Sequence, residues 1–92
     1  MESDFIWDLG KEALNVQKHG VDFKTASRAF LDPERKILLD KKHSQFETRY
    51  FCIAKINERI INVRFVYREN KIRILGAGFW RKGGKYYEEE KI

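Results

Sequence analysis

The sequence predicts a mixed α+β domain. Two N-terminal helices are expected to pack on an antiparallel meander of about four strands, followed by a short C-terminal segment or helix. Apolar residues before residue 33 recur at helical spacing, whereas from residue 36 onward they alternate with polar residues as in strands. A chain of 92 residues has the size of one domain, so residues 1–92 are expected to form a single unit.

The first helix is expected to begin at Leu9, after a short apolar run at residues 5–7 that we interpret as an edge strand. The Asp8 carboxylate can accept a hydrogen bond from a free N–H group of the first turn. Gly20 suits the left-handed backbone conformation that ends many helices. Between these caps, helical spacing is kept by Leu9, Ala13 and Val16.

A second helix is expected after Asp22, whose carboxylate can cap it in the same way. Pro33 ends this helix, because a proline disfavours the helical conformation of the residue before it, Asp32. The apolar stripe of the helix consists of Phe23, Ala26 and Phe30.

The second half of the chain is expected to form strands that short turns separate. The predicted strands are residues 36–40, 49–56, 60–68 and 71–77, with turns at 57–59 and 69–70. Successive side chains of a strand point to opposite faces of a sheet. By this parity the core face carries Tyr50, Cys52, Ala54, Ile56, Ile61, Val63, Phe65, Tyr67, Ile72, Ile74 and Gly76. If both turns have even length, the opposite face collects Arg49, Phe51, Ile53, Lys55, Arg64, Val66, Arg68, Lys71 and Arg73.

The net charge of +5 is unevenly distributed along the chain. Residues 1–48 carry −1, residues 49–87 carry +8, and residues 88–92 carry −2. A positive charge concentrated in one half indicates a polyanion or an acidic protein as a partner. The simpler alternative is that the charge only keeps a small domain in solution.

Several classes of protein are not expected. No stretch approaches the roughly 18 apolar residues of a membrane-spanning helix, and the N-terminal residues lack the apolar core of a secretory signal. We therefore expect a cytoplasmic protein with no membrane contact. The single cysteine, Cys52, excludes an internal disulfide, and two distant histidines do not form a metal site, so no metal or other cofactor is expected.

His43, Glu47 and Arg49 stand close together just before and at the start of a predicted strand. Such groups can act on a phosphodiester without a metal: a base deprotonates a ribose 2′-hydroxyl and an acid protonates the leaving 5′-oxygen. Arginines neutralise the charge that builds on the phosphate. The alternative is that Asp40, His43 and Glu47 only build a polar loop and satisfy its backbone.

Arg64, Arg68 and Arg73 fall on neighbouring predicted strands. A guanidinium offers planar donors to phosphate, and aromatic side chains among these residues can stack on bases, which favours a surface for single-stranded nucleic acid. The alternative is a solvated outer face. His19, beside Lys18 at the end of the first helix, is either a capping residue or a phosphate contact.

Short motifs occur in a fixed order along the chain. The first is Phe5-x-Trp7-Asp8-x-x-Lys11-x-x-x-Asn15-x-x-Lys18-His19-Gly20-x-x-Phe23-x-x-Ala26, followed by Asp32-Pro33 and then Asp40-x-x-His43-x-x-x-Glu47-x-Arg49. Arg73-Ile74-Leu75 with Ala77 forms the last motif. This ordered set, over roughly residues 5–77, resembles the BrnT-type toxins of type II toxin–antitoxin systems.

The resemblance implies a RelE-like fold and a ribonuclease that inhibits translation in the bacterial cytoplasm. It also implies neutralisation by a BrnA-like antitoxin whose other part binds DNA. The expected partners are therefore this antitoxin and RNA, with DNA contacted only through the antitoxin. On the matching and basic positions, we expect catalytic roles for His43, Glu47, Arg49, Arg64 and Arg73. RNA-binding roles are expected for Lys18, His19, Arg68, Lys71, Arg81 and Lys82.

The chain departs from this family at the end of the last strand. Family members usually continue with Ser-Ala-Arg, whereas this chain has Gly76-Ala77-Gly78. If the family's arginine helps to hold the scissile phosphate, its loss favours a non-catalytic module that binds RNA or an antitoxin. Arg81 or Lys82 could otherwise take its place.

Overall fold

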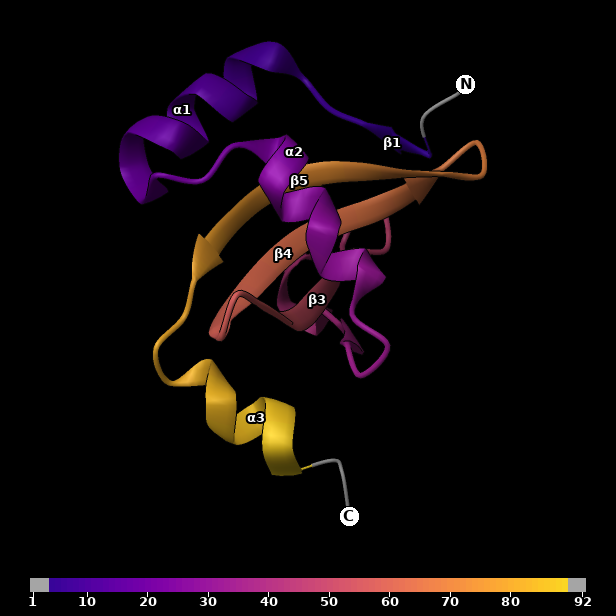
Figure 1. Cartoon of the computed structure of the whole chain (residues 1–92). Coiled ribbons are helices and arrows are strands. Elements are labelled where there is room, and N and C mark those ends of the chain that lie inside the picture. The colour runs from indigo at the N-terminus through magenta and orange to yellow at the C-terminus, as the bar shows by residue number, and fades with distance from the viewer. Residues whose placement is uncertain (1–3, 90–92) are drawn as a thin grey trace.

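The structure, a computed structural model, describes residues 4–89 and contains a five-stranded sheet in the order β1-β5-β4-β3-β2 (Figure 1). The strands are β1 (Phe5–Ile6), β2 (Lys36–Leu39), β3 (Tyr50–Ile56), β4 (Arg59–Arg68) and β5 (Lys71–Phe79). The helices are α1 (Leu9–His19), α2 (Phe23–Ser27) and α3 (Gly83–Glu89), with 3-10 turns η1 (Arg28–Leu31) and η2 (Lys41–His43).

The α+β class and the presence of two N-terminal helices are as predicted, but the second α-helix ends at Ser27, and the segment up to Leu31 that was expected to continue it is the 3-10 turn η1. The sheet has five strands instead of about four. The fifth strand is β1, the edge strand expected at residues 5–7, which pairs in parallel with β5. Strands β2 to β5 form the expected antiparallel meander. Helix α3 lies beyond the β3–β4 hairpin and contacts both of its strands (Figure 1).

Both predicted helix caps are present. An Asp8 Oδ2 atom accepts a hydrogen bond of 2.8 Å from the Lys11 N–H, and Asp22 Oδ1 accepts one of 2.6 Å from the Thr25 N–H. Gly20 ends α1 in the left-handed conformation, with φ of 69°. Capping carboxylates of this kind satisfy N–H groups that the helix itself leaves free.

The two hairpin turns each contain two residues in the left-handed region. They are Asn57-Glu58 and Glu69-Asn70, with φ between 49° and 69°. Two-residue turns of this kind match the twist of the strands they join. Because each turn has even length, Phe51 lies opposite Arg64, Val66 opposite Arg73, and Arg68 opposite Lys71. The basic residues therefore share one sheet surface, as predicted, and we call it the outer face.

A β-bulge in β5 corrects one prediction about the faces. Arg64 pairs with Gly76 and Phe65 pairs with Ile74, so Leu75 has no partner. An extra residue in one strand reverses the parity of everything after it. Gly76 therefore lies on the outer face opposite Arg64, and not on the core face, where Ala77 takes its place.

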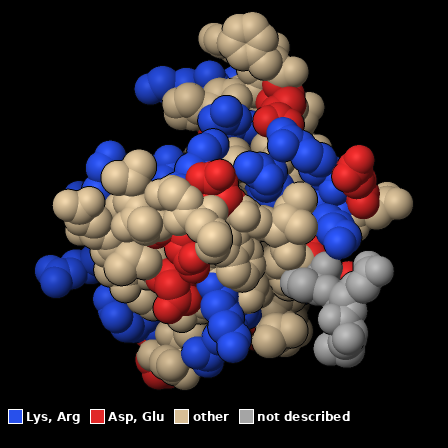
Figure 2. Space-filling model, turned by 90° about the horizontal axis from the view of Figure 1, so that it is seen from above, with Lys and Arg blue, Asp and Glu red and all other residues tan. Residues whose placement is uncertain are grey.

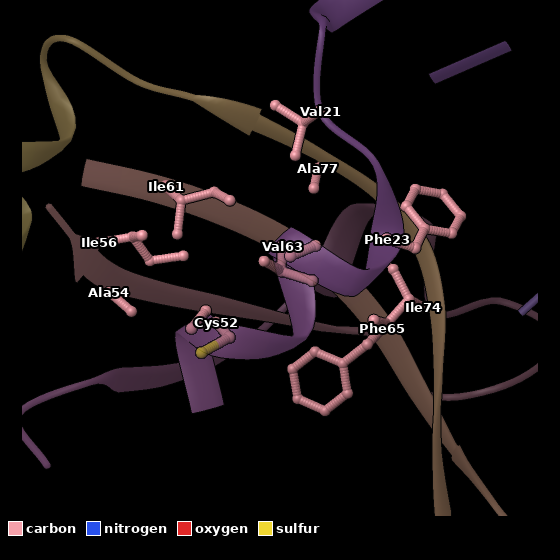
Figure 3. Close-up of a cluster of buried hydrophobic side chains, with 12 residues drawn as sticks. Val21, Phe23, Cys52, Ala54, Ile56, Ile61, Val63, Phe65, Ile74 and Ala77 are labelled. Carbon is pink, nitrogen blue, oxygen red and sulfur yellow. The ribbon is translucent and has the colours of Figure 1, made fainter. Parts of the chain in front are cut away.

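The hydrophobic core lies between the sheet and α2 (Figure 3). Phe23 and Ala26 of the predicted stripe are fully buried, and Phe30 packs against the same cluster. The predicted core-face residues of β3 and β4 are also found there, except that Tyr50 packs at its margin and Tyr67 is 56% exposed. The cluster consists of Val21, Phe23, Ala26, Ala29, Cys52, Ala54, Ile56, Ile61, Val63, Phe65, Ile74 and Ala77.

The apolar residues that recur at helical spacing in α1 do not pack on the sheet. Leu9 is 75% exposed and Val16 is 44% exposed, whereas the buried residue of the helix is Asn15. The Asn15 amide donates hydrogen bonds to the carbonyl oxygens of Ala77 (2.8 Å) and Val21 (2.9 Å), and its oxygen accepts one from the Ala77 N–H (3.1 Å). The helix is thus held against the edge of β5 by polar contacts.

Helix α3 is held near η1 by Asp32. The Tyr87 hydroxyl donates to Asp32 Oδ2 at 2.6 Å, and the N–H groups of Lys55 and Glu34 donate to the same carboxylate. Burial alone would raise the pKa of Asp32, but these three donors outweigh it and hold the pKa below its ordinary value.

We expect Tyr87→Phe to lower the free energy of unfolding at pH 7 by about 1.5–3 kcal/mol, the scale of one hydrogen bond to a charged group. Asp32 has a folded pKa below its unfolded pKa, so its stabilisation is present above the unfolded pKa and is lost as pH falls through the folded pKa. The difference between variant and wild type should therefore shrink in acid. Urea unfolding at pH 7 and in acid measures it, with Tyr67→Phe as the exposed control. A difference that does not depend on pH would contradict the role of Asp32.

Candidate functional site

The outer face carries a carboxylate surrounded by arginines. Arg68 Nη2 lies 2.9 Å and 3.1 Å from the two carboxylate oxygens of Glu47. This hydrogen bond, together with the charges of Arg68, Arg49 and Arg73, holds the pKa of Glu47 below its ordinary value. The fold thus brings Glu47 and Arg49, in the segment before β3, close to Arg68 of β4 and Arg73 of β5.

The predicted segment around His43 forms the loop between β2 and β3. Asp40 is 5% exposed, caps η2 through the His43 N–H, and holds His43 Nδ1 at 3.0 Å from Oδ2. Ser44 Oγ donates to the Asp40 carbonyl and accepts from the Arg49 N–H. Asp40 satisfies the loop backbone, as the polar-loop alternative expected, but Ser44 is its partner in doing so, whereas Glu47 is bound to Arg68.

Asp40 is a residue that sequence reasoning did not place in the site. Its contact with His43 resembles the carboxylate–imidazole pairs that fix the orientation and tautomer of a catalytic histidine. The His43 side chain remains 55% exposed. The spacing Asp40-x-x-His43 was visible in the sequence, but a carboxylate three residues from a histidine predicts no contact by itself. Among the described residues, no hydrogen bond joins His43 to Glu47.

Arg64 lies at the middle of the outer face, opposite Gly76 of β5. A Cβ atom added to Gly76 would lie 2.8 Å from Arg64 Cζ and 3.0 Å from Nε, so the guanidinium rests directly on the glycine backbone. A Cβ atom on Gly78 would instead lie 3.7 Å from the His19 ring, an ordinary contact. Gly76 and Gly78 thus lie beneath Arg64 and beside His19, respectively.

The remaining predicted RNA-binding residues do not gather at one place, and only Lys71 lies in the sheet. Lys71 is opposite Arg68 at one end of β4, while Lys18 and His19 lie at the end of α1. Arg81 and Lys82 are exposed between β5 and α3. Figure 2 shows basic side chains gathered in a band across the upper half of that view, with acidic side chains among them.

Other kinds of chemistry find little support within residues 4–89. This part of the chain has no group of three or more histidine, cysteine, aspartate or glutamate residues that could hold a metal ion. Burial raises the pKa of the Cys52 thiol to about 12, which leaves it protonated and unreactive at neutral pH. No described helix is long and apolar enough to cross a membrane.

The fold and this site define a class of protein: a small α+β domain in which one sheet face presents arginines around a carboxylate. Comparison with protein families gives the class its name. The family model of BrnT, the ribonuclease toxin of type II toxin–antitoxin systems, matches residues 7–83, and the chain therefore belongs to the BrnT family. A comparison with curated proteins finds no match. Membership implies a ribonuclease toxin with an antitoxin partner and an RNA substrate.

Proposed function

We propose that this chain is a metal-independent endoribonuclease that inhibits translation and is neutralised by a BrnA-like antitoxin. We also propose that its α+β fold is of the RelE type and that it acts in the cytoplasm. The observation that carries the proposal is the outer face, which presents Arg64, Arg68 and Arg73, with Arg49 just before β3 acting on the same carboxylate, Glu47, as Arg68 and Arg73. Clustered guanidinium groups on a sheet are suited to bind the phosphates of single-stranded RNA.

In the proposed reaction, the ribose 2′-oxygen attacks the adjacent phosphorus and the bond to the 5′-oxygen breaks. The products are a 2′,3′-cyclic phosphate and a 5′-hydroxyl. Arg49, Arg64 and Arg73 stabilise the charge that develops on the phosphate. Lys18, His19, Arg68, Lys71, Arg81 and Lys82 contact the rest of the RNA.

The proton transfers are assigned to His43 or Glu47. The lowered pKa of Glu47 makes its carboxylate a weaker base, and its ion pair with Arg68 occupies both oxygens. His43 has its Nδ1 atom held by Asp40 and a half-exposed ring. When Nδ1 carries the proton that Asp40 accepts, the Nε2 atom is free to take the 2′-hydroxyl proton, which favours His43 as the base. The imidazolium formed in this way, or water, supplies the proton that the leaving 5′-oxygen takes up.

Expression of the chain without an antitoxin tests this proposal. We expect growth arrest and rapid loss of intact messenger RNA. The purified protein should cleave single-stranded RNA in the presence of a chelator, and 2′-O-methyl RNA should resist cleavage. Normal growth with soluble protein and intact RNA would contradict the toxin assignment.

His43→Gln should lower cleavage by about 10²-fold or more, the usual size of one general base. Glu47→Gln should lower it much less. Cleavage rates measured with equal RNA occupancy of the enzyme distinguish the two variants. A larger loss of cleavage rate for Glu47→Gln than for His43→Gln would show that Glu47 is the base.

A second function, binding RNA or antitoxin without cleavage, is favoured by one observation. Gly78 stands where the family usually has an arginine, so the chain lacks that positive charge on β5. This function predicts RNA affinity that falls steeply with salt and no cleavage products.

A further inference from the structure

The side chain of Arg64 occupies space that a side chain at position 76 would need. A Cβ atom on Gly76 would contact Arg64 Nη2 and lie 2.8 Å from Cζ. Real Cβ atoms essentially never approach other atoms this closely. A residue larger than glycine at position 76 therefore requires the guanidinium of Arg64 to move.

The β-bulge creates this arrangement. Because Leu75 is the extra residue of β5, Gly76 faces outward and lies opposite Arg64. Gly76 is buried although it lies on the outer face, whereas the Arg64 side chain is exposed. The guanidinium thus covers the bare backbone of β5 and is still open to solvent.

Arg64 also differs from its neighbours in charge pairing. Arg68 is bound to Glu47, and the charges of Arg49 and Arg73 act on the same carboxylate. Among the contacts made within residues 4–89, Arg64 has neither a hydrogen bond nor an ion pair with an acidic group. Its donors are therefore available to an anion, and Arg73 lies on the same face of the neighbouring strand, diagonal to Arg64 across the strand pair.

We propose that Gly76 is a positioning residue, which lets Arg64 lie across β5 and hold an RNA phosphate together with Arg73. This inference rests on the proposed ribonuclease function. A guanidinium that already rests against the sheet loses less conformational freedom when it binds a phosphate than a side chain free in solvent. Planar, fork-shaped donors gain most from such preorganisation.

Gly76→Ala tests this inference, with Gly78→Ala as the matched control on the same strand and face. Gly76→Ala should fold, because the atoms that its Cβ meets are the free end of a flexible side chain. We expect Gly76→Ala to weaken binding of a 2′-O-methyl RNA oligonucleotide and to slow RNA cleavage by about 5–10-fold. Gly78→Ala makes only ordinary contacts and should stay within about twofold of wild type.

A double-mutant cycle shows whether the effect passes through Arg64. In an Arg64→Ala background, Gly76→Ala should have no further effect on binding or cleavage. An equal loss in both backgrounds would overturn the inference, as would full activity of Gly76→Ala. The wild-type protein is assayed before any variant. If it does not cleave RNA, the proposed ribonuclease function is contradicted, independently of the role of Gly76.

The mobility of the Arg64 side chain can be measured in the wild-type protein, without any substitution. Nitrogen relaxation of its Nε–H group should show a more ordered side chain than that of Arg28, which is exposed on the helical side. Equal mobility of the two arginines would overturn the inference. The Arg64 Nε–H signal should also shift in Gly76→Ala more than in Gly78→Ala.

Discussion

Replacing Arg64 and Arg73 together with alanine is expected to lower RNA cleavage by at least about 10³-fold and to abolish growth arrest. Each guanidinium is assigned to the phosphate, and the loss of one stabilising donor commonly slows such a reaction by about 10²-fold or more. RNA binding should weaken as well. Because the variant has two fewer guanidinium groups to neutralise phosphates, the slope of log affinity against log salt should fall by about 1.4 for a single strand.

The matched control removes two charges from the opposite side of the molecule. Lys24 and Arg28 are exposed on α2 and at the start of η1, away from the outer face. Lys24→Ala with Arg28→Ala lowers the net charge by the same amount, but should leave cleavage within a few fold of wild type. The cleavage rates of the two double variants are compared, and circular dichroism confirms that both are folded. Full activity of the Arg64/Arg73 variant would show that the outer face does not hold the phosphate.

Asn15→Leu is expected to have the largest effect on stability, about 3–5 kcal/mol. The substitution leaves the N–H and carbonyl groups of Ala77 and the carbonyl of Val21 without their side-chain partner. Each buried polar group that loses its partner costs about 1–3 kcal/mol. Domains of this size are stable by only about 5–15 kcal/mol, so a large part of the total would be lost.

Urea unfolding monitored by tryptophan fluorescence measures this loss. Gln17→Leu is the control, because it makes the same change of polarity on the exposed part of α1. The control should change the free energy of unfolding by less than about 0.5 kcal/mol. If both variants were equally stable, the Asn15 contacts would not be what holds α1 to β5.

Local signals in the sequence predicted much of the fold. Asp8 and Asp22 cap their helices as expected, because a capping carboxylate needs partners only three residues away. The alternation within β3 and β4 assigned most side chains correctly, although Ile53 and Val66 of the outer face are buried and Tyr67 of the core face is exposed. The basic residues could therefore be grouped on one surface before the structure was known.

The features that could not be predicted depend on distant partners. The bulge at Leu75 is a register shift between two strands, and the alternation of a single strand does not show it. Asn15 meets Ala77 across 62 positions of sequence, so its polar side chain gave no sign of burial. The position of Arg64 above Gly76 follows from that same bulge. The sequence therefore identified candidate site residues, while their partners, Asp40 and Gly76, required the structure.

The two hairpin turns have a consequence for the length of RNA that the outer face can accept. Glu58 and Glu69 are the only acidic residues between positions 49 and 87, and each lies in a turn at an opposite end of β4. Strand β4 has ten residues and is about 33 Å long. A polyanion that follows β4 therefore meets a negative charge at both ends. The negative charges at the tips of the two hairpins repel phosphates, which favours binding of a short segment of RNA over a strand that extends past both ends of β4.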